Sequence, residues 1–182
     1  LEAAIDALPR MGFAVFKLTG PDQAACAAKR YALVRRRAYW TYTCAEGAAF
    51  PPEPQVLRLC APDAEAAALW ALNGYDAQEI RAHFEEGGRG YALCEGDAPV
   101  SACFVYPNYR RVWEIAGVHT RPQARGRGHA RRVVCAALHD LAGEGRLPRY
   151  NVLDTNVPSI RLAESLGLRP ASTLTHYFAQ PL

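Results

Sequence analysis

Apolar residues recur along the chain at spacings that alternate between those of strands and those of helices. Over Arg110–Thr120 every second residue faces the same way, so Glu114 shares a face with apolar neighbours, and the stretch predicts a strand. From Gly128 the apolar positions fall on one helical stripe that ends at Gly143. A strand followed by a short helix is predicted again over Arg149–Thr155 and from Asn156 to Gly167.

The flanking segments extend this alternation in both directions. Val56–Cys60 is strand-like, Asp63 is placed to cap a helix that runs to about Leu72, and Asp76–Glu86 fits a second helix. Two β-rich runs separated by Glu95-Gly96-Asp97 predict a hairpin, and Ser172–Ala179 alternates as a last strand. The expected order after residue 55 is strand, two helices, hairpin, strand, helix, strand, helix, strand, which is an α/β (α+β) arrangement.

The N-terminal part differs in pattern and is set apart by prolines. Gly12–Leu18 is strand-like, and the stretch from Asp22 to Trp40 is predicted to be a helix. Residues 46–55 carry three prolines and form the best candidate linker. We therefore expect an N-terminal extension over residues 1–55 and a main domain over residues 56–182.

Composition narrows the classes of protein that fit. A chain of 182 residues that is 50% hydrophobic can bury a real core, and its longest apolar runs are too short for a membrane helix. The net charge of +3 is too small to indicate a nucleic-acid binder. The six cysteines are far apart without metal-ligand spacing, so we expect reduced core residues and no metal. We expect a soluble, cytoplasmic protein.

The stretch Val118–Arg132, VHTRPQARGRGHARR, joins the predicted strand to the predicted helix and contains the clearest chemical signal. Unpaired N–H groups at a helix start form an anion site, and the glycines Gly126 and Gly128 let an anion approach the backbone. Arg125 and Arg127 add positive charge at the rim. No G-K-[ST] follows, as a Walker A loop requires, and the third glycine of the dinucleotide fingerprint is missing.

Two segments resemble the GNAT acetyltransferase superfamily. Gln123–Gly128 is similar to its Q/R-x-x-G-x-G/A signature between a strand and an amphipathic helix. Asn156, Ser159 and Leu166-Gly167-Leu168 are similar to its N-x-x-[SA]…L-G-F segment. The resemblance covers Val56–Leu182 and implies a mixed, mostly antiparallel central sheet flanked by helices.

The resemblance also implies acetyl-CoA as co-substrate and a place for each of its parts. The backbone of Val118, His119 and Thr120 would hold the pantetheine arm, and amides between Arg125 and Ala130 would hold the pyrophosphate. Asn156 would contact the cofactor from the facing side, and Arg131 and Arg132 would reach the 3′-phosphate. The implied cofactor-binding residues are Val118, His119, Thr120, Gln123, Arg125, Gly126, Arg127, Gly128, His129, Ala130, Arg131 and Asn156.

The catalytic groups are less firmly placed. Glu114 is the only carboxylate on the strand that leads to the loop, so it is the candidate base; the alternative is a structural carboxylate paired with Arg110 or another arginine. Where many relatives carry a tyrosine that serves as the general acid, this chain has Ala163. Ser159, His119, Tyr177 or a water remain candidates for the acid, as does a thiolate that leaves unaided.

The resemblance therefore predicts an N-acetyltransferase that transfers an acetyl group directly from acetyl-CoA to an amine. We expect the acceptor to be a small molecule or a peptide, without nucleic-acid or membrane partners, and a homodimer is left open. The rival interpretation is a catalytically degenerate module that binds or senses acyl-CoA, which Ala163 keeps in consideration. Nucleic-acid binding through the glycine-arginine loop is disfavoured by the near-neutral charge.

Overall fold

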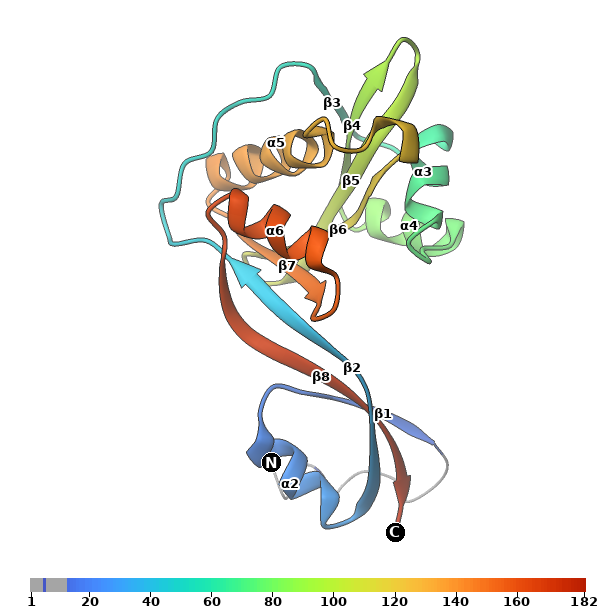
Figure 1. Cartoon of the computed structure of the whole chain (residues 1–182), viewed down its shortest axis with the longest axis vertical. Coiled ribbons are helices and arrows are strands. Elements are labelled where there is room, and N and C mark those ends of the chain that lie inside the picture. The colour runs from blue at the N-terminus through green and yellow to red at the C-terminus, as the bar shows by residue number, and fades with distance from the viewer. Residues whose placement is uncertain (1–4, 6–12) are drawn as a thin grey trace. The chain divides into compact units, whose positions relative to one another are not determined.

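A computed structural model describes residue 5 and residues 13–182 of the chain (Figure 1). The described residues form two compact units. The larger unit comprises Tyr42–Asn151 and Arg161–Arg169, and the smaller unit comprises the described part of Leu1–Thr41 together with Val152–Ile160 and Pro170–Leu182. Each unit is described by itself below.

The larger unit is built on a twisted sheet in the order β7-β6-β5-β4-β3. Neighbouring strands are antiparallel, except that β6 and β7 run parallel. The predicted hairpin is confirmed, with Gly96 in the left-handed conformation at its turn. The strands are β3 (Val56–Leu59), β4 (Arg89–Glu95), β5 (Ala98–Tyr109), β6 (Val112–Thr120) and β7 (Leu147–Leu153).

Helices cover both faces of this sheet, as the mixed, mostly antiparallel fold predicted from the sequence requires. The helices α3 (Ala64–Ala71) and α4 (Ala77–Glu85) begin where predicted, because the Asp63 and Asp76 carboxylates accept hydrogen bonds from backbone N–H groups three residues on. They pack on the face that carries Phe104. The helix α5 (His129–Gly143) packs on the opposite face, where the thiol of the adjacent Cys103 reaches the Val133 carbonyl.

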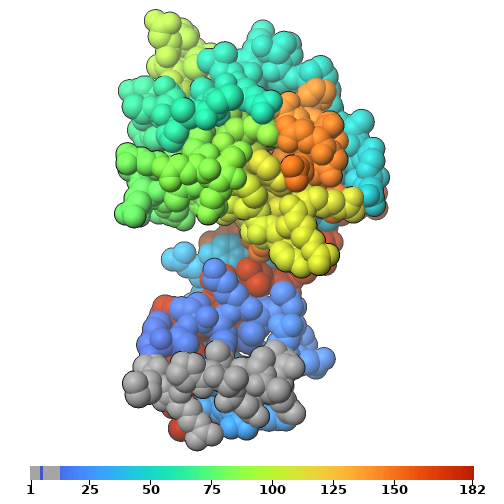
Figure 2. Space-filling view, turned by 180° about the vertical axis from the view of Figure 1, so that it is seen from behind, coloured from blue at the N-terminus to red at the C-terminus, as the bar shows by residue number. Residues whose placement is uncertain are grey.

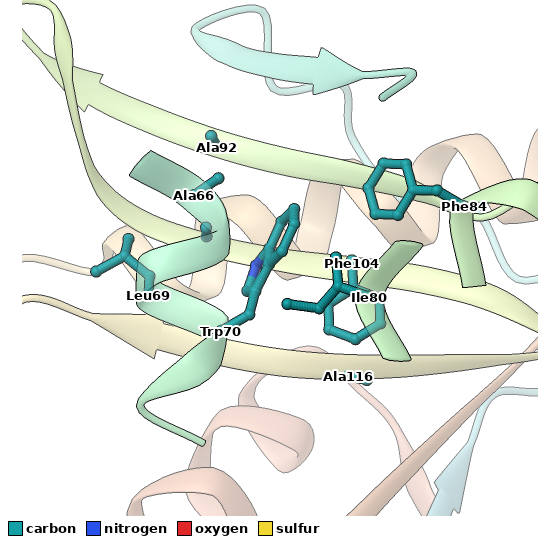
Figure 3. Close-up of a cluster of buried hydrophobic side chains, with 9 residues drawn as sticks. Ala66, Leu69, Trp70, Ile80, Phe84, Ala92, Phe104 and Ala116 are labelled. Carbon is teal, nitrogen blue, oxygen red and sulfur yellow. The ribbon is translucent and has the colours of Figure 1, made fainter. Parts of the chain in front are cut away.

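The core between the sheet and the helices α3 and α4 is organised around Trp70 (Figure 3). The Trp70 ring is fully buried and lies 5.1 Å from the ring of Phe104 and 5.8 Å from that of Phe84, measured between centroids. Small residues on the strands admit this ring, since a Cβ at Gly90 would come within 2.9 Å of it. The buried members are Ala66, Leu69, Trp70, Ile80, Phe84, Ala92, Ala102, Phe104 and Ala116.

The smaller unit holds the other three strands of the eight-stranded sheet and has a core of its own. Its strands lie in the order β1-β8-β2, with β1 (Ala14–Leu18) antiparallel to β8 (Arg169–Pro181), and residue 12 of the predicted first strand lies outside the described residues. Its core joins Leu18, Ala27 and Ala179 to the described Ile5 and to Tyr31. The helix α6 (Val157–Ser165), which follows β7, contributes residues to both units, as do β2 and β7.

The helix predicted from Asp22 to Trp40 is wrong over its second half. The helix α2 covers only Pro21–Ala28, and the chain then runs as the long strand β2 (Tyr31–Thr43). Alanines and arginines suggested a helix, but Tyr31 and Leu33 alternate onto the core of the smaller unit, and the Tyr31 ring meets the edge of Phe16. Pairing and packing of β-branched and aromatic residues outweighed local helix propensity here.

The cysteines differ from expectation in one respect. Cys103 and Cys135 are buried, but Cys60 is exposed. All six are free. Among the described residues, no group of three or more His, Cys, Asp or Glu side chains is arranged to hold a metal, and no helix there has the length and apolar character required to cross a membrane.

Gly117 is the position where the core tolerates least change. Its φ is +61°, and a Cβ would lie 2.6 Å from the Phe104 ring and 2.9 Å from Trp70. We therefore expect Gly117→Ala to lower the free energy of unfolding by about 2–4 kcal/mol, from overpacking and left-handed strain together. Gly96→Ala is the matched control, because its φ of +62° is the same but nothing lies within 4 Å; it should cost about 1 kcal/mol. Equal losses in urea unfolding would contradict the packing argument.

Candidate active site

A β-bulge in β6 shapes the edge of the sheet beside the predicted loop. Ala102 pairs with His119 and Phe104 pairs with Ala116, so two residues of β6 oppose the single residue Cys103 of β5. Gly117 supplies the positive φ at this point. The parallel ladder between β6 and β7 ends at the pair Ile115–Tyr150. The last part of β6 therefore continues beyond the ladder with β7, with its backbone re-aimed by the bulge.

The turn of α3–α4 reaches this re-aimed backbone. The Asn73 side-chain amide donates a hydrogen bond to the Val118 carbonyl over 3.2 Å. On the β5 side, the Ser101 hydroxyl donates to the His119 carbonyl over 3.2 Å. The backbone of β6 that was predicted to hold a pantetheine arm is thus held from two sides by polar side chains.

The loop after β6 opens directly onto the start of α5. A 3₁₀ turn, η1 (Pro122–Ala124), anchors it through the buried Ala124, and the Arg125 guanidinium donates to the Thr120 carbonyl over 3.1 Å. Gly126 and Gly128 have φ values of +77° and +79°, and a Cβ at either would meet nothing within 4 Å. No side chain caps α5. Its first N–H groups therefore face open space, which suits a phosphate.

The charged side chains around the loop are mostly held by carboxylates. Glu95, at the end of β4, lies 3.1 Å from the Arg127 guanidinium and 3.3 Å from Nε2 of His129. Arg132 forms an ion pair with Glu53, with 3.0 Å between Nε and Oε2. Arg131 is exposed on α5. The amides of the loop, more than its arginines, are therefore the groups aimed at a ligand.

His119 is half-buried on β6 beside the loop. Burial and the nearby Arg125 guanidinium both lower the pKa of His119 from its ordinary value. The imidazole is therefore neutral at neutral pH. In that form it adds no charge to the site.

Glu114 is a buried carboxylate at the middle of β6, only 7% exposed. Asn151 donates to its Oε1 over 2.9 Å, and the Arg149 Nε lies 3.3 Å from its Oε2. Tyr106 on β5 and Arg149 on β7 are its direct neighbours across the strands. The arginine partner that the sequence left open is thus Arg149, and not Arg110.

Three neighbours of Glu114 were not identified from the sequence. Arg149 and Asn151 are two positions apart on β7, and the period of a strand places both on one face. Tyr106 lies on β5, where burial and then the Glu114 carboxylate raise the pKa of its phenol well above the usual range. Tyr106 therefore stays protonated and neutral. The alternation in RYN could have suggested Arg149 and Asn151 as a pair, but their partner is set by parallel register.

The remaining predicted residues belong to other surroundings. Asn156 and Ser159 lie in the smaller unit, where the Asn156 side chain accepts a hydrogen bond from the Ser159 N–H over 3.2 Å and so caps α6. Ala163, at the position of the expected tyrosine, is fully buried. The larger unit thus brings together Glu114 and the predicted loop residues Val118–Arg131, without Asn156 and Ser159.

A comparison of the sequence with family models identifies one family. A sequence model described as GNAT acetyltransferase matches residues 77–177, which is more than half of the chain. The chain belongs to the GNAT acetyltransferase family. The residues matched include the bulge, the glycine loop and all of α5.

Solved GNAT structures share the fold of this family member. A GNAT-family acetyltransferase from Novosphingobium aromaticivorans is 18% identical with a TM-score of 0.66, over 100% of this chain and 80% of that chain. A GCN5-related N-acetyltransferase from Kribbella flavida is 20% identical with a TM-score of 0.67, over 90% and 67%. A Bacillus subtilis acetyltransferase in complex with CoA is 12% identical with a TM-score of 0.57, over 70% and 98%. No curated protein matches the chain.

The ion pair between Glu114 and Arg149 is expected to stabilise this GNAT protein. Arg149→Met removes the cation from a buried carboxylate and should lower the free energy of unfolding by about 2–3 kcal/mol at pH 7. A buried carboxylate without its cation has a raised pKa, so the loss should shrink as the pH falls and the group protonates. Thermal unfolding between pH 7 and pH 5 measures this.

The matched control is Arg111→Met, which breaks a shorter but exposed pair, 2.7 Å from Glu46. Exposed pairs contribute little, so this variant should lose much less stability than Arg149→Met at pH 7, and its loss should change little between pH 7 and pH 5. An equal, pH-independent loss in both variants would show that burial of Glu114 does not govern the stability of its pair.

Proposed function

We propose that this protein is an N-acetyltransferase that moves an acetyl group from acetyl-CoA to an amine by direct transfer. The observation that carries the proposal is the uncapped start of α5 behind Gly126 and Gly128. The amides at the start of α5 can donate to an anion, and the two glycines have no Cβ that would keep the anion away from the backbone. The solved relative in complex with CoA supports the same donor.

The chain offers separate groups for each part of the donor. The amides of Gly126, Gly128 and the first turn of α5 bind the pyrophosphate, with Gln123 and Arg125 at the rim. The backbone of Val118 and its neighbours in β6 binds the pantetheine arm, because the bulge turns it away from the ladder with β7. Arg131, His129 and Ala130 lie at the helix start, where the 3′-phosphate and pyrophosphate would be held.

Glu114 is the group that acts on the acceptor. Its buried carboxylate attracts an ammonium and accepts its proton, directly or through a water, before the amine attacks. Asn151 and Arg149 fix the orientation of both carboxylate oxygens. The N–H of Val118 polarises the acetyl carbonyl, and a water returns a proton to the leaving thiolate.

One observation favours a second candidate function. Ala163 stands where many members of the family carry a tyrosine as the general acid. It is fully buried, so this position lies in the core and has no hydroxyl group. A module that binds acyl-CoA and senses it without turnover would have the same loop and no need of an acid. Thiol release in the presence of amines separates the two functions, since only the enzyme produces it.

Calorimetric titration of acetyl-CoA, with ATP as the control anion, tests the donor site. We expect micromolar binding of acetyl-CoA and a loss of at least tenfold in Gly126→Asp, because the new carboxylate occupies the place of the phosphates and repels them. Gly145→Asp is the matched control: it also has a positive φ, +66°, and open space around it, but lies beyond the other end of α5. Unchanged affinity in Gly126→Asp would remove the loop from the donor site.

The role of Glu114 is tested by Glu114→Gln, which keeps the size of the side chain and removes its charge. We expect kcat to fall by roughly 100-fold or more, as for loss of a general base, while the affinity for acetyl-CoA holds. Glu46→Gln, in an exposed ion pair, serves as control and should keep full activity. A kcat and a pH-rate profile that both match the unmodified protein would eliminate Glu114 as the base.

A further inference from the structure

Four aromatic side chains lie together on the sheet face beside Glu114. His83 of α4 stacks on Tyr106 of β5 with 3.7 Å between ring centroids and 17° between the planes. Phe104 lies 5.8 Å from Tyr106 and 5.0 Å from Tyr75, which meets it edge to face. We call Tyr75, His83, Phe104 and Tyr106 the aromatic face.

The aromatic face has a buried centre and a half-buried rim that a small molecule can touch. Phe104 is fully buried in the Trp70 core, whereas Tyr75, His83 and Tyr106 are half-buried. The space-filling view shows the α4 segment, in green, against the yellow segment of β5 and β6 on one continuous surface (Figure 2). The rim therefore belongs to the surface of the larger unit, next to the residue that acts on the acceptor.

The charges around the rim are mainly negative. Glu114 is the direct neighbour of Tyr106 across the strands, and Glu79 lies 4.0 Å from Nε2 of His83, so two carboxylates and the guanidinium of Arg149 lie around the rim. Arg149 is already held by Glu114 at 3.3 Å and by the Asn108 amide at 3.1 Å. The balance attracts an ammonium and repels a carboxylate.

Resting on the function proposed above, we propose that the acceptor is a primary amine carried on an aromatic body, without a carboxylate next to the amine. Its ammonium is drawn to Glu114, and its ring packs on the aromatic face around Tyr106. Ring pairs favour this class over a straight aliphatic amine, which carries the same ammonium without a ring. Repulsion from Glu114 and Glu79 disfavours the corresponding amino acid, because its carboxylate would enter beside the ammonium.

The test compares three acceptors at saturating acetyl-CoA: 2-phenylethylamine, phenylalanine, which adds the carboxylate, and butylamine, which lacks the ring. Thiol release gives kcat/KM for each. We expect 2-phenylethylamine to exceed each of the other two by about tenfold, through charge repulsion in the comparison with phenylalanine and through ring packing in the comparison with butylamine.

A variant pair assigns the preference to the aromatic face. Tyr106→Leu keeps apolar bulk and removes the ring, and should lower kcat/KM for 2-phenylethylamine by up to about tenfold while changing that for butylamine less than about twofold. Tyr109→Leu is the matched control, since Tyr109 lies on the same strand but is 62% exposed and pairs with Arg110. It should change neither value.

The outcomes separate this inference from the function on which it rests. Failure to bind acetyl-CoA overturns the proposed function. If acetyl-CoA binds, then turnover of phenylalanine or butylamine as good as that of 2-phenylethylamine overturns the acceptor class alone, as does turnover of none of the three. An equal loss for all three acceptors in Tyr106→Leu would make the ring structural and likewise overturn the inference.

Discussion

The close packing of Gly117 under Phe104 and Trp70 is the constraint on which both core and site depend. The core needs the Trp70 ring against the strands, and the absence of a Cβ at Gly117 makes room for it. The same residue takes the positive φ of the bulge, which shifts the register between β5 and β6 and directs the backbone of Val118 away from the ladder with β7. A single residue without a side chain thus couples the packing of α3 to the geometry of the strand end.

The second constraint is the buried charge of Glu114. A carboxylate that is 7% exposed is costly unless its oxygens are engaged, and here one oxygen accepts from Asn151 while the other lies beside Arg149. The arginine stabilises the charged form, which weakens the carboxylate as a base but holds it ready for an ammonium. The pair therefore suits binding and orientation of a cationic acceptor, with proton removal coupled to the approach of the amine and not to a free, strongly basic carboxylate.

Local signals in the sequence predicted the elements of the larger unit well. The caps Asp63 and Asp76 and the passage from a strand through Gly126 and Gly128 into α5 depend on neighbours a few residues apart, so the sequence displays them directly. Features set by pairing between distant segments were missed. Residues 31–40 fit a helical pattern, but pairing with other strands places them in β2. Gly117 fits an ordinary strand pattern, and only its register with β5 shows that it lies in a bulge. Which arginine meets Glu114 depended on parallel register across β6 and β7.

The strand β6 places two opposite chemistries on one rigid element. Its end leads into the amides of the loop and α5, which suit an anion, and its middle carries Glu114 beside aromatic rings, which suit a cation. The two regions, Glu114 and Val118, are four residues apart, about 13 Å along an extended strand. In the proposed function, this separation would keep the ammonium of an acceptor away from the phosphates of the donor, to which it would otherwise be drawn. The bulge lies between the two regions, where two residues of β6 oppose one of β5, so the backbone of Val118 does not follow the regular pairing that holds Glu114.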